Sequence, residues 1–231
     1  MKMTMKMKMK MKMKIEKGRV AGMAEKSAGI CAQCGRTVTR GAMTTHLRQC
    51  VAGAGALHVV VSGQDAPAYW LHIAVSRDAP LRAADEFLRA TWLECCGHLS
   101  VFQIDGKYYE SLPDEGEEGM DIAAERAFGE DARQIGYQYD FGSTTRLKLS
   151  VAGEVDAGAA GPSGVALLAR NLAPEITCGV CQASPAPDVC PYCGGFLCAG
   201  CRQGHACDAD GLLPVVNSPR TGVCAYTGPE G

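Results

Sequence analysis

The chain has 231 residues, of which 47% are apolar and 21% charged, and its formal net charge is −2. This is an ordinary globular balance, and no apolar run approaches the roughly 18 to 20 residues that cross a bilayer, so the sequence excludes a transmembrane protein. The 13 cysteines are more than occasional apolar packing requires, and they need an explanation.

The amino-terminal residues are charged throughout and lack the apolar stretch of a secretory signal. We therefore expect a cytoplasmic protein, and in a reducing compartment cysteines serve as metal ligands rather than as disulfides. Residues 1–29 are predicted to be a disordered basic tail, because an alternating Met/Lys repeat cannot bury enough apolar surface to order itself. Met23 is an alternative start.

Charge is unevenly distributed along the chain. Residues 1–20 contain seven Lys and one Arg against one Glu, a charge of +7, which leaves −9 for the rest. Residues 51–178 form the most acidic part, and phosphate backbones would be repelled there. Any contact with nucleic acid is therefore expected only through residues 1–50.

A compact Cys/His segment follows at 30–50, with the pattern Cys31-x2-Cys34-x11-His46-x3-Cys50. The Cys-x2-Cys turn presents two thiolates, and ligands four apart lie on one face of a helical turn, so the four residues can close a tetrahedron around zinc. The segment resembles a ββα zinc finger that has Cys50 as its final ligand.

After a Gly/Ala linker at 51–56, residues 57–174 are predicted to form the main domain. Period-two alternation predicts a strand at Ala68–Ser76, and three-and-four spacing predicts a helix from Pro80 to about Glu94. Asp105-Gly106 predicts a hairpin turn between 101–104 and 107–110. A short helix near 122–128 and strands at 137–140, 144–151 and 165–170 complete the domain.

Because strands and helices do not alternate strictly, the expected fold class is α+β. We expect a mainly antiparallel sheet with helices on one face, flanked by two small zinc-binding modules.

The second Cys-rich module is predicted at 177–209, followed by a tail at 210–231. Its eight ligands are Cys178, Cys181, Cys190, Cys193, Cys198, Cys201, His205 and Cys207. The module looks like the cross-brace of the B-box, in which ligand pairs interleave: Cys178, Cys181, Cys198 and Cys201 would hold one ion, and Cys190, Cys193, His205 and Cys207 the other. Two sequential sites are the alternative. With the finger this gives three structural zinc ions, whose fully occupied coordination leaves no open catalytic position.

Two motifs of the main domain resemble the Ri-plasmid ORF-three-like family, also described as TnpR-type passenger proteins of insertion elements. They are His98-Leu99 with Phe102, and Tyr137-x-Tyr139-Asp140-Phe141-Gly142. The resemblance covers about residues 66–172, and 212–220 also resembles family members with a Cys-rich end. It implies an α+β fold and a link to mobile elements, but no reaction. Ser143-Thr144-Thr145 departs from the family, which usually has Asp and Trp after Phe-Gly.

One further constellation could carry chemistry. Cys95, Cys96, His98 and Asp140 could bind a metal or run nucleophilic catalysis if the fold brought them together. The competing interpretation is that the two cysteines are small buried residues, and that His98 and Asp140 satisfy backbone groups at turns. No P-loop, dinucleotide fingerprint or His-Glu-x-x-His helix is present.

The leading functional hypothesis is a zinc-binding, non-catalytic adaptor whose expected partner is a protein. The first alternative is a nucleic-acid-binding accessory protein of an insertion element, which would use the basic tail and the finger. The second alternative is an enzyme centred on Cys95, Cys96, His98 and Asp140. The role of Cys224 and the oligomeric state are left open by the sequence.

Overall fold

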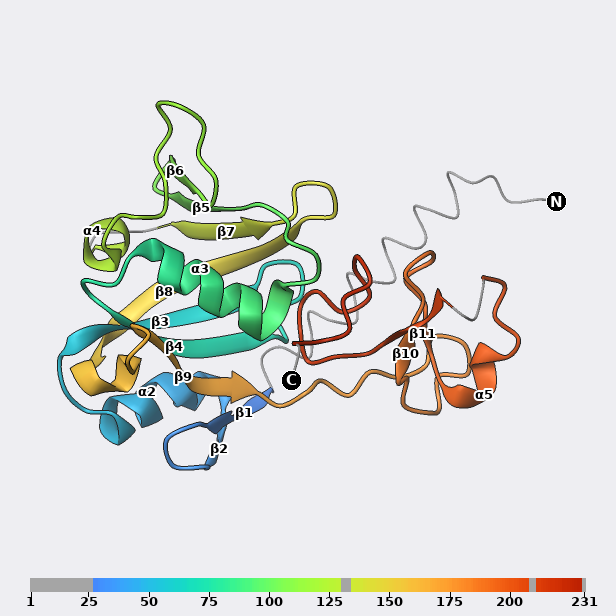
Figure 1. Ribbon diagram of the computed structural model, residues 1–231. Helices are drawn as coiled ribbons and strands as arrows, with labels where there is room; N and C mark the ends of the chain where they lie inside the picture. The colour runs from blue at the N-terminus through green and yellow to red at the C-terminus, as the bar shows by residue number, and fades with distance from the viewer. Residues whose placement is uncertain (1–26, 130–133, 208–210, 230–231) are drawn as a thin grey trace.

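The structure, a computed structural model, describes residues 27–129, 134–207 and 211–229. Most of the predicted basic tail, residues 1–26, lies outside the described residues. Nine strands form one sheet in the order β2-β1-β9-β4-β3-β8-β7-β5-β6, and all neighbouring strands are antiparallel (Figure 1). The strands are β1 (Ala28–Cys31), β2 (Thr37–Thr39), β3 (Gly55–Gly63), β4 (Trp70–Ser76), β5 (Ser100–Ile104), β6 (Lys107–Glu110), β7 (Ile135–Tyr139), β8 (Thr145–Asp156) and β9 (Val165–Asn171).

Helices of the main domain cover one face of this sheet (Figure 1). They are α3 (Leu81–Leu88), the π-helix η1 (Arg89–Leu93) and α4 (Ala124–Phe128). Helix α2 (Arg40–Cys50) and the 3-10 turn η2 (Ala157–Ala160) contribute to a separate core on the opposite face. The expected α+β class with a mainly antiparallel sheet is therefore confirmed, and its apolar residues divide between two cores rather than one.

On strand β4, period-two alternation predicts one buried face, whereas both faces are buried. Leu71 and Ile73, which share one face of the strand, lie in the core beneath α3. The alternate residues Trp70 and Ala74 are equally buried, because they face α2 on the other side. Helix α3 begins at Leu81 as expected, but the helix predicted to reach Glu94 continues after Leu88 only as the π-helix.

The hairpin at Asp105-Gly106 is confirmed, and both residues have positive φ angles. Strand β3, in contrast, was not predicted. It lies between β4 and β8 at the centre of the sheet, and its run Leu57–Val61 is almost entirely buried. A strand covered on both faces reads as a continuous apolar run without period two, so alternation gives no signal there.

The amino-terminal Cys/His segment extends the main sheet. Strand β1 pairs with β9, and α2 packs Met43 and Leu47 into the second core. The chain then reaches β3 by residue 55, so the end of the predicted 51–56 linker is already part of a strand.

The carboxyl-terminal Cys-rich segment forms its own three-stranded sheet in the order β11-β10-β12 (Figure 1). Its elements are β10 (Asp188–Val189), β11 (Phe196–Leu197), β12 (Leu213–Pro214) and the single-turn helix α5 (Ala199–Arg202). After β12 the chain returns to the main domain (Figure 1). Within the described residues, no helix has the length and apolar character that crossing a bilayer requires.

Candidate metal centres

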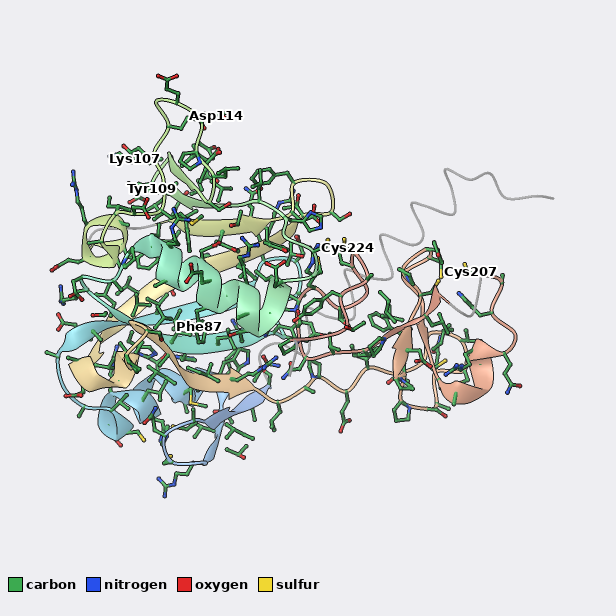
Figure 2. All side chains as sticks on the ribbon, in the orientation of Figure 1. Phe87, Lys107, Tyr109, Asp114, Cys207 and Cys224 are labelled. Atoms are coloured by element: carbon green, nitrogen blue, oxygen red, sulfur yellow. The ribbon has the colours of Figure 1, made fainter. Side chains whose placement is uncertain are left out.

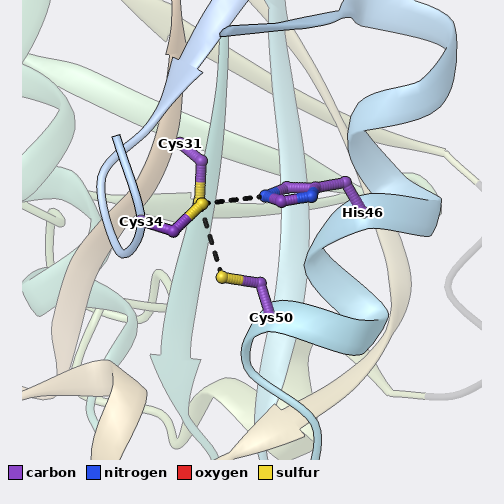
Figure 3. A group of neighbouring side chains, drawn as sticks. All are labelled: Cys31, Cys34, His46 and Cys50. Carbon is purple, nitrogen blue, oxygen red and sulfur yellow. Dashed lines mark hydrogen bonds between the residues drawn. The ribbon is translucent and has the colours of Figure 1, made fainter. Parts of the chain in front are cut away.

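The amino-terminal ligand set is brought together by two elements. Cys31 ends β1, Cys34 lies in the following turn, and His46 and Cys50 stand on α2, with all four side chains directed toward one another (Figure 3). The turn closes through the bond from the Gly35 N–H to the Cys31 carbonyl, 2.9 Å long, and Gly35 has a φ of 70°. One donor atom from each of the four residues lies within 4.8 Å of the others.

The spacing of the donor atoms fits a tetrahedral metal ion. Zinc–sulfur bonds of about 2.3 Å and zinc–nitrogen bonds of about 2.0–2.1 Å predict tetrahedral edges of about 3.8 Å between sulfurs and about 3.5 Å between sulfur and nitrogen. The Sγ atoms of Cys31 and Cys50 lie 3.9 Å apart, and Cys34 Sγ lies 3.4 Å from His46 Nε2. These residues therefore fit such an ion in both donor type and distance.

The carboxyl-terminal ligands form two clusters, and their grouping is interleaved rather than sequential. Cys178, Cys181, Cys198 and Cys201 form one cluster, and Cys190, Cys193, His205 and Cys207 form the other. The Sγ atoms of Cys181 and Cys198 are 3.8 Å apart, and Cys193 Sγ lies 3.4 Å from His205 Nε2. The short strands β10 and β11 pair with each other directly before Cys190 and Cys198, which belong to different clusters.

Backbone N–H groups lower the pKa of some of these thiols and so favour the thiolate form. The N–H of Cys181 donates to Cys178 and lowers the pKa of that thiol to about 6, and the N–H of Arg36 likewise lowers the pKa of Cys34. Within the same cluster as Cys178, the hydrogen bond with Cys198 and desolvation raise the pKa of Cys201 to about 12. A divalent cation at the centre of the cluster stabilises the thiolate form of all four ligands, so metal binding releases protons.

A fourth Cys/His cluster lies outside the three predicted zinc sites, although metal binding was one of the roles considered for three of its residues. Cys95, Cys96 and His98 follow η1, and Cys224 joins them from the carboxyl-terminal tail, with all four donor atoms within 4.8 Å. Neither cysteine of the vicinal pair is a fully buried apolar residue, since Cys95 is half-buried and Cys96 exposed. The sequence identified Cys95, Cys96 and His98 as a candidate group, but no local sequence pattern links them to Cys224.

Asp140 is committed to other partners. Its Oδ1 accepts the backbone N–H groups of Gly142 and Ser143 at 3.0 and 3.1 Å, and its Oδ2 accepts a 2.7 Å bond from Arg220. Asp140 therefore caps a turn, as the structural interpretation of the sequence expected. His98 Nε2 is 3.5 Å from Asp140 Oδ2, but it lies closer to the sulfurs of Cys96 and Cys224, at 3.0 and 3.3 Å.

The fold and these clusters define a mainly antiparallel α+β protein whose 13 cysteines are all free and all belong to Cys/His groups able to hold metal ions. No family model matches the chain, and a comparison with curated proteins finds no match.

Among solved structures, the chain is similar to the crystal structure of a protein of unknown function from Methanosarcina mazei Go1. The TM-score is 0.37 and the sequence identity 16%, and the match covers 42% of this chain and 58% of that chain.

Proposed function

We propose that this chain is a zinc-binding, non-catalytic adaptor of the plasmid ORF-three-like family that works in the cytoplasm and binds a protein partner. The observation that supports it most directly is that each predicted ligand set converges with four protein donors. A zinc ion with four protein ligands has no open position for a catalytic water, so these ions would stabilise structure. Thiolate and imidazole donors at tetrahedral spacing favour zinc over harder cations.

The surface of the carboxyl-terminal module is suited to a protein partner. Asp188 and Arg202, the two charged residues between Cys178 and Cys207, pair with each other at 3.3 Å. The turns Cys178-x2-Cys181 and Cys190-x2-Cys193 present apolar side chains instead, since Val180 is 65% and Tyr192 71% exposed. An aromatic and an aliphatic side chain on a nearly uncharged surface are typical of a protein interface rather than a phosphate-binding one.

The nucleic-acid alternative has less support within the described residues. Two arginines of the finger are directed to the main domain: Arg40 donates to the Pro67 carbonyl, and Arg48 donates to the Ala152 carbonyl. The long loop after β6 carries Asp114, Glu115, Glu117 and Glu118, and Asp114 lies near its tip (Figure 2). The alternative therefore rests mainly on the basic residues 1–20, which lie outside the described residues.

The residues of the enzymatic alternative lie close together, but their reactive groups are already engaged in other contacts. Asp140 is held by Arg220 and two backbone amides, and His98 is in contact with two thiols. Cys224 completes a closed set of four donors, which favours a structural role over a nucleophilic one.

Metal analysis of the purified full chain tests the zinc part of the proposal. We expect at least three zinc ions per chain by elemental analysis against protein concentration. A content of one or none would contradict the ligand assignment.

Site-specific photocrosslinking in cells tests the adaptor part. A photoreactive amino acid in place of Tyr192 should give discrete protein adducts, whereas the same group in place of Leu112, which is 70% exposed in the main domain, should not. Adducts that disappear with nuclease, or equal labelling from both positions, would contradict a protein-binding module.

A further inference from the structure

The three cysteines outside the predicted ligand sets are brought to one place by the fold. Of the 13 cysteines, ten lie in the three clusters already described, and the remaining ones are Cys95, Cys96 and Cys224. The chain positions of Cys96 and Cys224 differ by 128 residues, yet their Sγ atoms lie 3.8 Å apart. His98, one of five histidines, lies with them, and its Nε2 is 3.3 Å from Cys224 Sγ.

The distances in this cluster resemble those of the predicted sites. The Sγ atoms of Cys95 and Cys96 are 3.6 Å apart, close to the about 3.8 Å edge of a zinc–thiolate tetrahedron. The separations from His98 Nε2 to Cys96 and Cys224, 3.0 and 3.3 Å, are slightly below the about 3.5 Å edge between sulfur and nitrogen. All sulfur–sulfur distances far exceed the about 2.05 Å of a disulfide.

We propose that Cys95, Cys96, His98 and Cys224 form a fourth zinc site, which fastens the carboxyl-terminal tail to the main domain. Three ligands come from the loop that follows η1, and the fourth comes from the tail after it has left the carboxyl-terminal module. Figure 2 shows Cys224 on the tail beside the main domain, apart from Cys207 in the module. The site therefore joins two parts of the chain that the module separates in sequence.

The local backbone presents the ligands on both sides. Gly97 has a φ of 78°, and its N–H donates to Glu94 Oε1 at 2.6 Å, which closes the loop between Cys96 and His98. On the tail, the Tyr226 N–H bonds to the Val223 carbonyl at 3.0 Å, so Cys224 lies within a tight turn. The Tyr226 side chain is 1% exposed and anchors this turn.

The charge around the cluster is also balanced for a bound dication. Three thiolates and a neutral imidazole around Zn²⁺ leave one negative charge. Arg220, on the same tail, places Nη2 3.4 Å from Cys95 Sγ and supplies a positive charge at the edge of the site. Such outer hydrogen bonds orient ligands and tune metal sites. Arg220 and Cys224 thus hold the tail at two neighbouring points.

This inference goes beyond the proposed function, because a failure to bind any protein partner would leave the fourth site unaffected. The experiment uses the purified full chain loaded with zinc or with cadmium-113. We expect four zinc ions per wild-type chain and four cadmium resonances, three from sites with three sulfurs and one nitrogen and one from a site with four sulfurs. Cys224→Ser should bind three ions and lose one resonance, while the other three remain.

Ala225→Ser changes the neighbouring residue without removing a ligand and should keep all four ions. His98→Asn provides a second variant with the same expected loss of one ion. Three ions in the wild-type chain, or four resonances retained in Cys224→Ser, would overturn the fourth site. A failure of the three predicted sites would instead show as fewer than three ions in Cys224→Ser and wild type alike.

Discussion

Arg220 carries a charge but has no exposed surface, and the tail places its side chain among polar groups of the main domain. Its guanidinium donates to Asp140 Oδ2 at 2.7 Å, to Thr145 Oγ1 at 3.1 Å and to the Ser143 carbonyl at 3.2 Å. It also lies 4.8 Å from the centre of the Tyr139 ring. Tyr139 ends β7 and Asp140 follows it, so this end of the strand serves to receive the tail.

Arg220→Ala should lower the free energy of unfolding by about 3–5 kcal/mol, because it leaves the Asp140 carboxylate buried without its partner. Asp140→Asn combined with Arg220→Ala should recover part of this loss, since no uncompensated charge remains. Urea unfolding followed by tryptophan fluorescence measures both variants. Strictly additive losses in the double variant would contradict the coupling.

His58 on β3 and His72 on β4 form a buried pair, with His58 Nε2 2.8 Å from His72 Nδ1. Desolvation lowers the pKa of His58 to about 4 and that of His72 to about 3, and the nearby charges of Arg48 and Arg40 act in the same direction. Both groups are therefore neutral in the folded protein near pH 7.

Because the unfolded chain binds protons near pH 6.5 and the folded pair does not, stability should fall as the pH drops below 6.5. The expected loss between pH 6.5 and 5 is on the order of 2 kcal/mol per imidazole. The double variant His58→Gln/His72→Gln should show a shallower dependence of the unfolding free energy on pH. Protonation of the Cys/His clusters affects both proteins alike. Equal slopes would show that the pair does not titrate in this way.

At the scale of elements, the amino-terminal segment is attached to the sheet through a close approach of β1 to β9. Gly29 pairs with Asn171, and a Cβ at Gly29 would collide with the Trp70 ring and the Arg170 carbonyl. The Trp70 indole N–H donates to Ser27 Oγ at 2.9 Å at the same junction. The amino-terminal segment can thus lie against the main sheet because Gly29 has no side chain.

Gly29→Ala should therefore destabilise the protein by about 1–3 kcal/mol, since neither the buried ring nor the backbone can move away cheaply. Gly41→Ala is the matched control, because a Cβ at Gly41 meets nothing within 4 Å and alanine favours the helix. Urea denaturation of the two variants should show a loss for Gly29→Ala and no loss for Gly41→Ala. Equal stability would mean that β1 is not held against β9.

At the scale of the whole molecule, the chain leaves the main domain after β9, forms the carboxyl-terminal Cys/His module and returns. The returning tail donates from Ser218 Oγ to the Trp92 carbonyl at 2.6 Å, and Asn217 pairs with Asn171 at 2.7 Å. It also supplies β12 to the small sheet of the module. The tail is therefore structural for both parts, although no local pattern in its sequence indicates these contacts.

Deleting residues 211–231 should destabilise the main domain by about 3–5 kcal/mol, because the buried salt bridge and Tyr226 are lost together. Both tryptophans, Trp70 and Trp92, lie in the main domain, so their fluorescence reports that domain alone. A chain that ends after residue 229 keeps these contacts and should unfold as the full chain does. An unchanged midpoint in the longer deletion would show that the tail is not part of the domain.

Local patterns were enough for much of the fold. Alternation at 69–75, helical spacing from Leu81 and the Asp105-Gly106 turn each depend on neighbours within a few residues, and all three elements are present. Strand β3 escaped detection because both of its faces are covered. The second core was missed for the same reason. Alternation assigns Trp70 and Ala74 to the solvent side of β4, whereas both pack into the core on the face opposite α3.

The sequence by itself determined the short-range ligand sets, because a Cys-x2-Cys knuckle and a helical His-x3-Cys pair fix donor spacing within one turn of chain. Only the tertiary structure decided that Cys224 meets Cys95, Cys96 and His98, and that Arg220 meets Asp140. These pairs are separated by 80 residues or more, and their meeting depends on how the sheet and the returning tail pack. Long-range proximity of this kind follows from the summed burial of many side chains, which no local pattern encodes.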